Sequence, residues 1–232
     1  MRHNIFQQTK TTARVRSLFR AAFVLGYALG TVIYARAQHI TPPTTPPLIT
    51  PEEGNSAFLV GHAVGTQGYV CLPTGPGAST ASWTVNNARP EATLFLSPGG
   101  NSFQIITHFL SPNENPKNPT GPVPFGNATW QSSFDSSRVW AAVLNGIAIP
   151  ASSGEPSCPN TGSIPCLLLE TVGSLEGPTG GTLLSKTSFI QRLNTNGGSA
   201  PTQGCINAND VGKQALVPYT ADYFFFRRDK DK

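Results

Sequence analysis

The sequence predicts an all-β domain, either a sandwich or a barrel-like antiparallel architecture of about ten short strands with long Pro- and Gly-rich loops. Three observations favour this class. Charged residues make up only 12% of the 232-residue chain, too few for a coiled coil or a long solvated helix. Glycine (23 residues) and proline (21 residues) are frequent, which disfavours a large helical bundle. The apolar residues come in short runs separated by turn residues, a pattern typical of β-strands.

The predicted strands follow one another with turn signals between them, such as Gly75-Pro76-Gly77 and Asn196-Gly197-Gly198. They cover residues 57–60, 67–72, 80–85, 92–97, 102–110, 138–144, 166–172, 187–193, 214–217 and 219–226. Residues 135–144 also suit one short helix, because Asp135 is a good N-cap and Asn145-Gly146 would end the helix. The run 219–226 carries aromatic residues on both of its alternating faces, which predicts a central strand covered on two sides.

The first 37 residues are predicted to be a signal peptide. Five basic residues precede an uncharged apolar run at 21–34, and Ala35-Arg36-Ala37 forms a cleavage site before Gln38. A helix of that run would rise only about 21 Å, short of the roughly 30 Å hydrocarbon core, so we expect no membrane span after cleavage. Removal of residues 1–37 changes the formal net charge from +4 to −2, because the segment carries six Lys or Arg and no acidic residue. The mature chain therefore has no basic surface that favours nucleic acid.

The mature chain is predicted to hold one domain. Residues 38–53 carry five prolines and are expected to form a semi-rigid tether, 54–226 a single β domain, and 227–232 a charged tail. Residues 111–126 also carry five prolines and no strand pattern, which indicates a surface loop. The expected location is secreted or periplasmic.

All four cysteines lie in the exported part, which favours two disulfides in an oxidising compartment, with three pairings open. Cys158 and Cys166 flank a turn-rich segment, so we expect them to pair with each other. Cys71 and Cys205 would then pair across 134 residues. The spacings do not suit a metal site, and we expect no metal and no cofactor.

Three segments resemble one protein family: HAVGTQGYVC at 62–71, FIQRLNTNGGSAPTQGC at 189–205 and VPYTADYFF at 217–225. On these residues the chain resembles the exported domain-of-unknown-function family 3455, over about residues 57–226. The family has no established activity, so the resemblance implies a group without a reaction. Two positions depart from its pattern: Cys166 stands where the family usually has Trp, and Ile106 where it has Gly. No G-x-G-x-x-G follows a predicted strand, which disfavours a dinucleotide site.

His62, His108 and Asp222 are the candidates for catalysis, because two imidazoles and a carboxylate can act as acid and base or hold a metal. The alternative is that the three residues have structural roles, since nothing in the sequence indicates that they lie close together. His108 alternates with Ile106 and Leu110, as a half-buried, hydrogen-bonded histidine would.

Arg192 and Asp222 are charges on aromatic or apolar strands, so each is expected to have a partner. We predict that Asp222 is bonded within the fold, with Arg192 as the first candidate. The alternative is a ligand clamp in which Arg192 lies in a pocket with Gln191, Tyr219 and Tyr223. The three tryptophans are either core residues or a carbohydrate-stacking platform; they are Trp83, Trp130 and Trp140.

These observations favour an exported, disulfide-linked β domain with a binding or structural role in the cell envelope or outside the cell. The partner classes considered are a carbohydrate and another envelope protein. The alternative is a metal-assisted hydrolase or redox enzyme that uses His62, His108 and Asp222.

Overall fold

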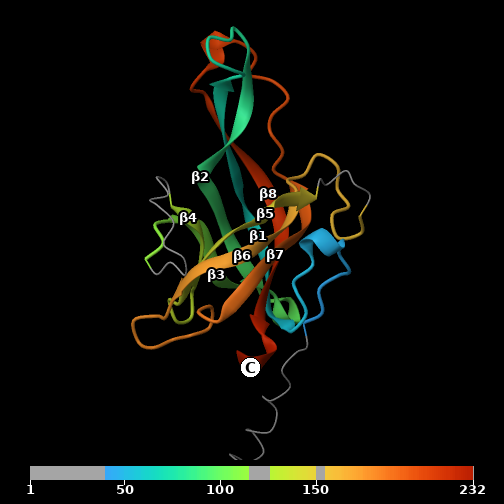
Figure 1. Cartoon of the computed structure of the whole chain (residues 1–232), viewed down its shortest axis with the longest axis vertical. Helices are drawn as coiled ribbons and strands as arrows, with labels where there is room; N and C mark the ends of the chain where they lie inside the picture. Colours follow the sequence, from blue (N-terminus) through green and yellow to red (C-terminus); the bar gives the residue numbers. More distant parts are fainter. Residues whose placement is uncertain (1–39, 115–125, 150–154, 232) are drawn as a thin grey trace, which may run out of the picture. The chain divides into compact units, whose positions relative to one another are not determined.

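The computed structural model describes residues 40–114, 126–149 and 155–231, and Figure 1 shows their arrangement. Eight antiparallel strands close into a barrel in which each strand pairs with its neighbour in sequence and β8 pairs with β1. The strands are β1 (Asn55–Pro73), β2 (Ala81–Leu96), β3 (Phe103–Ser111), β4 (Asn127–Ser132), β5 (Arg138–Ile149), β6 (Cys166–Leu175), β7 (Thr187–Gly197) and β8 (Gln214–Arg228). The helical elements of the described residues are the short 3-10 turns η1 (Pro47–Ile49), η2 (Pro98–Gly100), η3 (Ala208–Asp210) and η4 (Asp229–Asp231).

The all-β prediction is confirmed, and the architecture is the barrel. The strands are fewer and longer than predicted. The runs 57–60 and 67–72 belong to the one strand β1, the runs 80–85 and 92–97 to β2, and the runs 214–217 and 219–226 to β8. The sequence reading also missed β4.

The helix considered for residues 135–144 is wrong, because residues from Arg138 onward form β5. Asp135 instead orders the turn between β4 and β5. Its Oδ1 accepts hydrogen bonds from the backbone N–H and the hydroxyl of Ser137, and its Oδ2 accepts one from the N–H of Leu183. The carboxylate therefore stabilises a turn and not a helix start.

The glycines of β1 explain why the strand continues where the sequence suggested a break. A Cβ at Gly65 would collide with the backbone oxygen of Glu91 on β2. Glycine is therefore needed there because the two strands approach closely, and it does not mark a turn.

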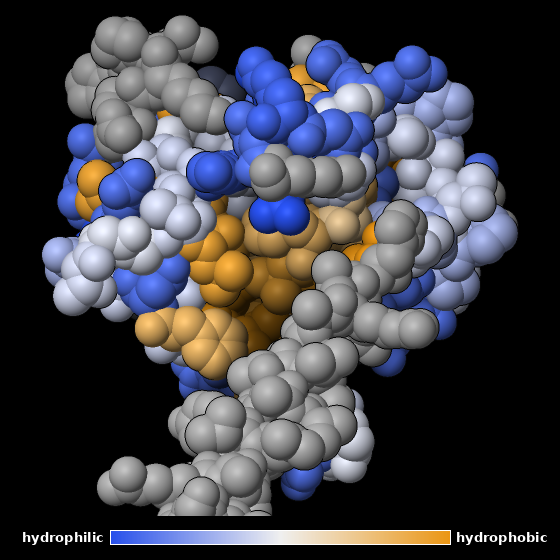
Figure 2. Space-filling view, turned by 90° about the horizontal axis from the view of Figure 1, so that it is seen from below, coloured by the Kyte–Doolittle hydropathy of each residue, from blue (hydrophilic) through white to orange (hydrophobic). Residues whose placement is uncertain are grey.

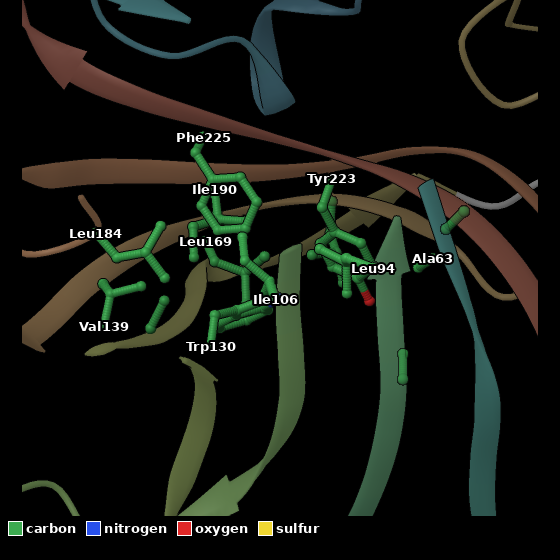
Figure 3. Packing of buried hydrophobic residues seen from close by; sticks show 14 of the residues in the cluster. Ala63, Leu94, Ile106, Trp130, Val139, Leu169, Leu184, Ile190, Tyr223 and Phe225 are labelled. Atoms are coloured by element: carbon green, nitrogen blue, oxygen red, sulfur yellow. The ribbon is translucent and has the colours of Figure 1, made fainter. Parts of the chain in front are cut away.

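One half of the barrel interior is filled by large apolar side chains, and we call it the packed half. Because the topology is up-and-down, the β2–β3, β4–β5 and β6–β7 connections lie at the same end of the barrel. Leu94, Ile106, Leu184, Ile190 and Phe225 are fully buried near this end and belong to one cluster. Figure 3 shows these side chains pointing toward one another from different strands. Their burial excludes water from this half and supplies hydrophobic stabilisation.

The end of the barrel that carries these connections is the one near the C-terminus in Figure 1. Seen from this side, apolar side chains lie in a central depression with hydrophilic residues around it (Figure 2). Phe103 and Phe134, at the β2–β3 and β4–β5 connections, are among the exposed large apolar residues.

A second apolar cluster covers the outer face of β6, β7 and β8. Phe224 and Phe226 point outward there, opposite to Tyr223 and Phe225, so the predicted two-sided burial of this strand is confirmed. Ile49 of η1 is fully buried in this cluster. From Ile40 onward, the segment expected to be a tether therefore belongs to the same compact unit as the barrel. Residues 1–37, including the predicted signal peptide, lie outside the described residues.

Both predicted disulfides are present, Cys71–Cys205 and Cys158–Cys166, and no described cysteine is free. Each lies at or next to a connection at the end opposite to the packed half. Cys71–Cys205 joins the end of β1 to the β7–β8 connection, and Cys158–Cys166 closes the β5–β6 connection onto β6. In Figure 1 the β1–β2 hairpin and the segment with η3 extend together past the barrel.

Candidate functional site: a cavity inside the barrel

The other half of the barrel interior contains a cavity of about 490 Å³, and we call it the hollow half. All eight strands contribute to its wall. The lining comprises Gln67, Tyr69, Val85, His108, Leu110, Gly126, Asn127, Ala128, Trp130, Ala141, Ala142, Val143, Ile164, Pro165, Leu167, Leu169, Arg192 and Tyr223. Leu110, Gly126 and Pro165 lie at the β3–β4 and β5–β6 connections, opposite to the packed half. Barrels of eight strands have room for one small ligand, and cavities of this volume are typical of ligand sites.

Small side chains explain why this half is hollow. Ala128 on β4 and Ala141 on β5 are direct register partners, and both line the cavity. A methyl group at each of these neighbouring positions leaves space that a leucine or phenylalanine would fill. The space is a consequence of residue size on an otherwise regular pair of strands.

Trp130 and His108 form an aromatic stack at the boundary between the two halves. Their ring centroids are 4.2 Å apart and the ring planes differ by 8°. Tyr223 lies 5.7 Å from His108 and 5.8 Å from Trp130, at tilted angles. Trp130 belongs to the packed cluster and also lines the cavity, so the stack separates filled from empty space.

His108 is a neutral imidazole. Burial lowers its pKa to about 4; the positive charge of Arg192 lowers it further, and the hydrogen bond to Thr129 opposes the shift. The Nδ1 of His108 lies 2.9 Å from the backbone oxygen of Thr129, so Nδ1 carries the proton and donates it. Nε2 is then the unprotonated acceptor. The hydrogen bond expected for this histidine is present, but the side chain is buried and not half-buried as expected.

Two tyrosines, Tyr69 and Tyr223, line the cavity, and a third, Tyr219, is hydrogen-bonded to Tyr223. The hydroxyl of Tyr69 donates to the backbone oxygen of Gly198 at 2.6 Å, and the hydroxyls of Tyr219 and Tyr223 lie 3.0 Å apart. Burial raises the pKa of Tyr69 and raises that of Tyr219 well above 10. The hydroxyls of Tyr69 and Tyr219 therefore supply no negative charge near neutral pH.

Arg192 brings a positive charge to the cavity wall. Its Nε and Nη2 donate to the backbone oxygen of Pro165 at 3.1 and 2.9 Å. Its positive charge adds to the lowering of the pKa of His108 and opposes the rise in the pKa values of Tyr69 and Tyr219. No Asp or Glu is among the described residues of the lining.

The prediction that Arg192 pairs with Asp222 is wrong. Asp222 lies on the outer face of β8, where its Oδ1 is 2.6 Å from Nδ1 of His62 and its Oδ2 accepts a hydrogen bond of 2.7 Å from Asn194. The prediction that Asp222 is bonded within the fold is correct, but its partners are these two residues. In the register of β7 and β8, Arg192 is opposite Tyr223, and Leu193 is opposite Asp222. Arg192 and Asp222 consequently point to opposite sides of the barrel wall.

The three catalytic candidates do not form one site. His62 and Asp222 are brought together on the outer face, and the His62 side chain is 55% exposed. His108 is buried inside the barrel and lines the cavity. No group of three or more His, Cys, Asp or Glu that could hold a metal is found in the described part of the chain.

The proposed clamp is formed only in part. Arg192 and Tyr223 line the cavity together with Trp130, and Tyr219 is hydrogen-bonded to Tyr223. Gln191 is absent from this group because it points outward. Its Nε2 donates to the backbone oxygen of Ile49 at 2.6 Å, which holds the segment containing η1 against the barrel.

The three tryptophans do not form an exposed stacking platform. Trp130 and Trp140 are both fully buried, and Trp140 donates to the hydroxyl of Ser111 from the outer side of β5. Trp83 packs beside the Cys71–Cys205 disulfide and donates to the backbone oxygen of Gln203. Of the two readings, the structure supports core packing.

The sequence reading missed several residues of the cavity wall. Gln67 and Tyr69 share the inward face of β1 with Cys71, a spacing that was visible in the HAVGTQGYVC segment. Ala128 alternates with Trp130 on the strand that was missed. No sequence signal distinguishes an alanine that borders a cavity from one in a packed core, because that depends on which side chains face it across the barrel.

The fold and cavity define a class: a closed, antiparallel barrel of eight strands with a cavity inside. A family description, "Protein of unknown function (DUF3455)", matches residues 51–227. The chain belongs to this family, as its sequence motifs indicated. Searches of curated proteins and of solved structures returned no significant match. Within the described ranges, no helix has the length and apolar character that a membrane crossing requires.

Proposed function

We infer that this chain is a secreted or periplasmic binding domain whose barrel cavity holds one small, largely apolar ligand. The cavity of about 490 Å³ carries the proposal, because its wall is mostly apolar and aromatic with a few polar groups. This composition is the usual one for small-molecule sites, where apolar surface gives affinity and a few polar groups give orientation. We therefore propose a small apolar molecule as the partner, in place of the carbohydrate or envelope protein that the sequence alone suggested.

Export supports a binding role outside the cytoplasm. Two disulfides suit an oxidising compartment, and the first 37 residues have the three parts of a signal peptide. N-terminal sequencing of the exported protein should begin at Gln38. A chain that begins at Met1 outside the cytoplasm would contradict the cleavage.

Ligand binding is tested with N-phenylnaphthylamine, a neutral aromatic probe whose fluorescence rises in apolar surroundings. The protein is produced from its full sequence in an exporting host. We expect saturable binding of one probe per chain, and Ala141→Phe should weaken binding by at least about tenfold because the new ring occupies the cavity.

Val64→Phe is the matched control, since Val64 is 58% exposed and is not part of the cavity wall. It introduces the same ring on the outer face of β1 and should leave the affinity unchanged. No saturable binding, or equal binding by the Ala141→Phe variant, would contradict the proposed function.

A further inference from the structure

We propose that the ligand of this cavity is an amphipathic monoanion, with an apolar body in the hollow half and its negative charge at Arg192. This inference rests on the proposed function and names the chemical class of its ligand. A carboxylate or sulfonate on an aryl or alkyl body has this chemistry.

The charge of the described cavity wall is unbalanced. Arg192 is its only charged side chain among the described residues, since no Asp or Glu lines the cavity and His108 is neutral at physiological pH. Asp222, the nearest acidic residue in the register, points to the outer face and is occupied by His62 and Asn194. A partly buried cation with no counter-ion is costly, and an anionic ligand would offset that cost.

The guanidinium of Arg192 also has donors left for a ligand. Nε and Nη2 donate to the backbone oxygen of Pro165, which fixes the orientation of the guanidinium plane. Nη1 makes no hydrogen bond to any residue in the described ranges, and Arg192 forms no ion pair there. A guanidinium that is held on one edge and free on the other is well arranged to bind an anion.

Trp130 supplies a second unsatisfied donor in the same wall. Its side chain is fully buried, and its indole Nε1 has no hydrogen-bond acceptor among the described residues. A buried donor without an acceptor costs free energy. The described part of the wall thus carries an unpaired cation, Arg192, and next to the cavity an indole N–H without an acceptor.

The rest of the wall suits an apolar body and not a polar one. Ala128, Ala141, Leu167 and Leu169 line the cavity from β4, β5 and β6 and offer only apolar surface. A small inorganic anion would satisfy Arg192 but leave this surface without a partner. An amphipathic anion satisfies both parts of the site at once.

The test compares two fluorescent probes with the same ring system. Anilinonaphthalene sulfonate carries one negative charge, and N-phenylnaphthylamine is the same skeleton without the sulfonate. We expect the anionic probe to bind at least about tenfold more tightly than the neutral one, because hydrogen bonds to charged groups are stronger than those between neutral groups. Arg192→Gln should bring the two affinities within about threefold of each other, mainly by weakening the anionic probe.

Two further variants keep the result interpretable. Arg192→Lys keeps the charge and should retain most of the preference for the anionic probe, which separates charge recognition from a general disturbance of the wall. Arg228→Gln removes an exposed cation outside the cavity lining and should leave both affinities unchanged. Each variant must unfold cooperatively, because anilinonaphthalene sulfonate also binds loosely packed states.

The outcomes separate this inference from the proposed function. If both probes bind and Ala141→Phe blocks both, but Arg192→Gln leaves the preference unchanged, the anion inference is wrong and the binding function stands. The same conclusion follows if the wild-type protein binds the two probes equally. If neither probe binds, or Ala141→Phe has no effect, the proposed function fails and the inference fails with it.

Discussion

The two halves of the barrel interior differ in the size of the side chains that the same strands turn inward. In the packed half, Leu94, Ile106 and Phe225 meet and exclude space. In the hollow half, Ala128 and Ala141 leave a cavity of about 490 Å³. Inward and outward residues alternate along the strands of both halves, with register shifts in the hollow half at Gln67/Tyr69 and Trp140/Ala141. Alternation therefore builds the barrel, and residue size decides which half can hold a ligand.

The hollow half also differs in how it is held together. The described disulfides, Cys71–Cys205 and Cys158–Cys166, both lie toward its end of the barrel, where the interior lacks a filled core. The packed half is held by apolar burial and by the hydrogen bonds of Asp135 across its connections. Disulfides thus contribute to stability at the hollow end of the barrel, whereas side-chain packing contributes at the packed end.

The largest effect is expected from the long-range disulfide. Replacing both Cys71 and Cys205 with Ser should lower the free energy of unfolding by about 4–5 kcal/mol, because the bond closes a loop of 134 residues in the unfolded chain. Urea titration measures the change. Replacing Cys158 and Cys166, which are 8 residues apart, should cost only about 2.5 kcal/mol in the same model. A larger loss from the short loop would show that it supports the cavity wall beyond its entropy.

Substitutions in the two halves should differ in cost. Phe225→Ala removes a fully buried ring from the packed half and should lower the free energy of unfolding by about 3–5 kcal/mol. Leu110→Ala, in the hollow half, should cost about 1 kcal/mol, because Leu110 is only partly buried and already borders empty space. Chemical denaturation measures both. Equal losses would contradict the division of the interior into a packed and a hollow half.

His108 should make stability depend on pH. Its pKa is about 4 in the folded protein and about 6.5 in an unfolded chain. Above pH 6.5 neither state is protonated there. As the pH falls from 6.5 to 4, the unfolded state takes up a proton that the folded state does not, so the free energy of unfolding should fall by up to about 3 kcal/mol.

His108 stacks on Trp130 and lies at a tilted angle to Tyr223, and its imidazole is the group whose pKa burial lowers. His108→Gln should therefore lose most of the slope between pH 6.5 and 4, measured by urea unfolding at a series of pH values. His62→Gln, on the exposed outer face, is the control. A slope that survives in the His108→Gln protein would contradict a buried neutral imidazole.

The sequence predicted the fold class because alternation and turn residues are local signals. It also predicted both disulfides, since one pair was close in sequence and only one other pair remained. It misjudged the strand lengths, since the predicted runs left out residues 61–66, where Gly65 lets β2 approach β1. A glycine that ends a strand and a glycine that lets a neighbouring strand approach closely look the same in the sequence. Only the position of the neighbouring strand distinguishes them.

The candidate site was predicted only in part, because the sequence does not show how neighbouring strands are placed against one another. The sequence shows that Arg192 shares a face with Ile190 and that Asp222 shares one with Phe224. It does not show which face points into the barrel when both faces carry apolar residues. The register places Arg192 opposite Tyr223 and puts Asp222 on the other side. Pairing two charges across strands therefore requires the register as well as the alternation.

Asp135 should contribute a smaller amount at the packed end. Asp135→Asn should lower the free energy of unfolding by about 1–2 kcal/mol, because the charged acceptor of the hydrogen bonds from Ser137 and Leu183 becomes a neutral amide. Burial opposes the ionised form, but these hydrogen bonds prevail and hold the pKa of Asp135 at about 2. This stability is present above about pH 4 and is lost as the pH falls toward 2. Thermal unfolding at pH 7 and pH 3 should show a smaller difference between variant and wild type at pH 3.

The smallest change is expected where a residue is enlarged in the hollow half. Ala141→Leu places new methyl groups in the cavity and should alter the free energy of unfolding by less than about 1 kcal/mol, because no neighbour has to move. Ala221→Leu makes the same change on β8. Both alanines belong to the same buried cluster, but Ala221 lies outside the cavity lining, so its enlargement should cost about 1–3 kcal/mol through overpacking. Denaturant titration of the two variants compares the halves directly. An equal cost would mean that the wall around Ala141 is as tightly packed as the wall around Ala221, and the hollow half would then have no room for a ligand.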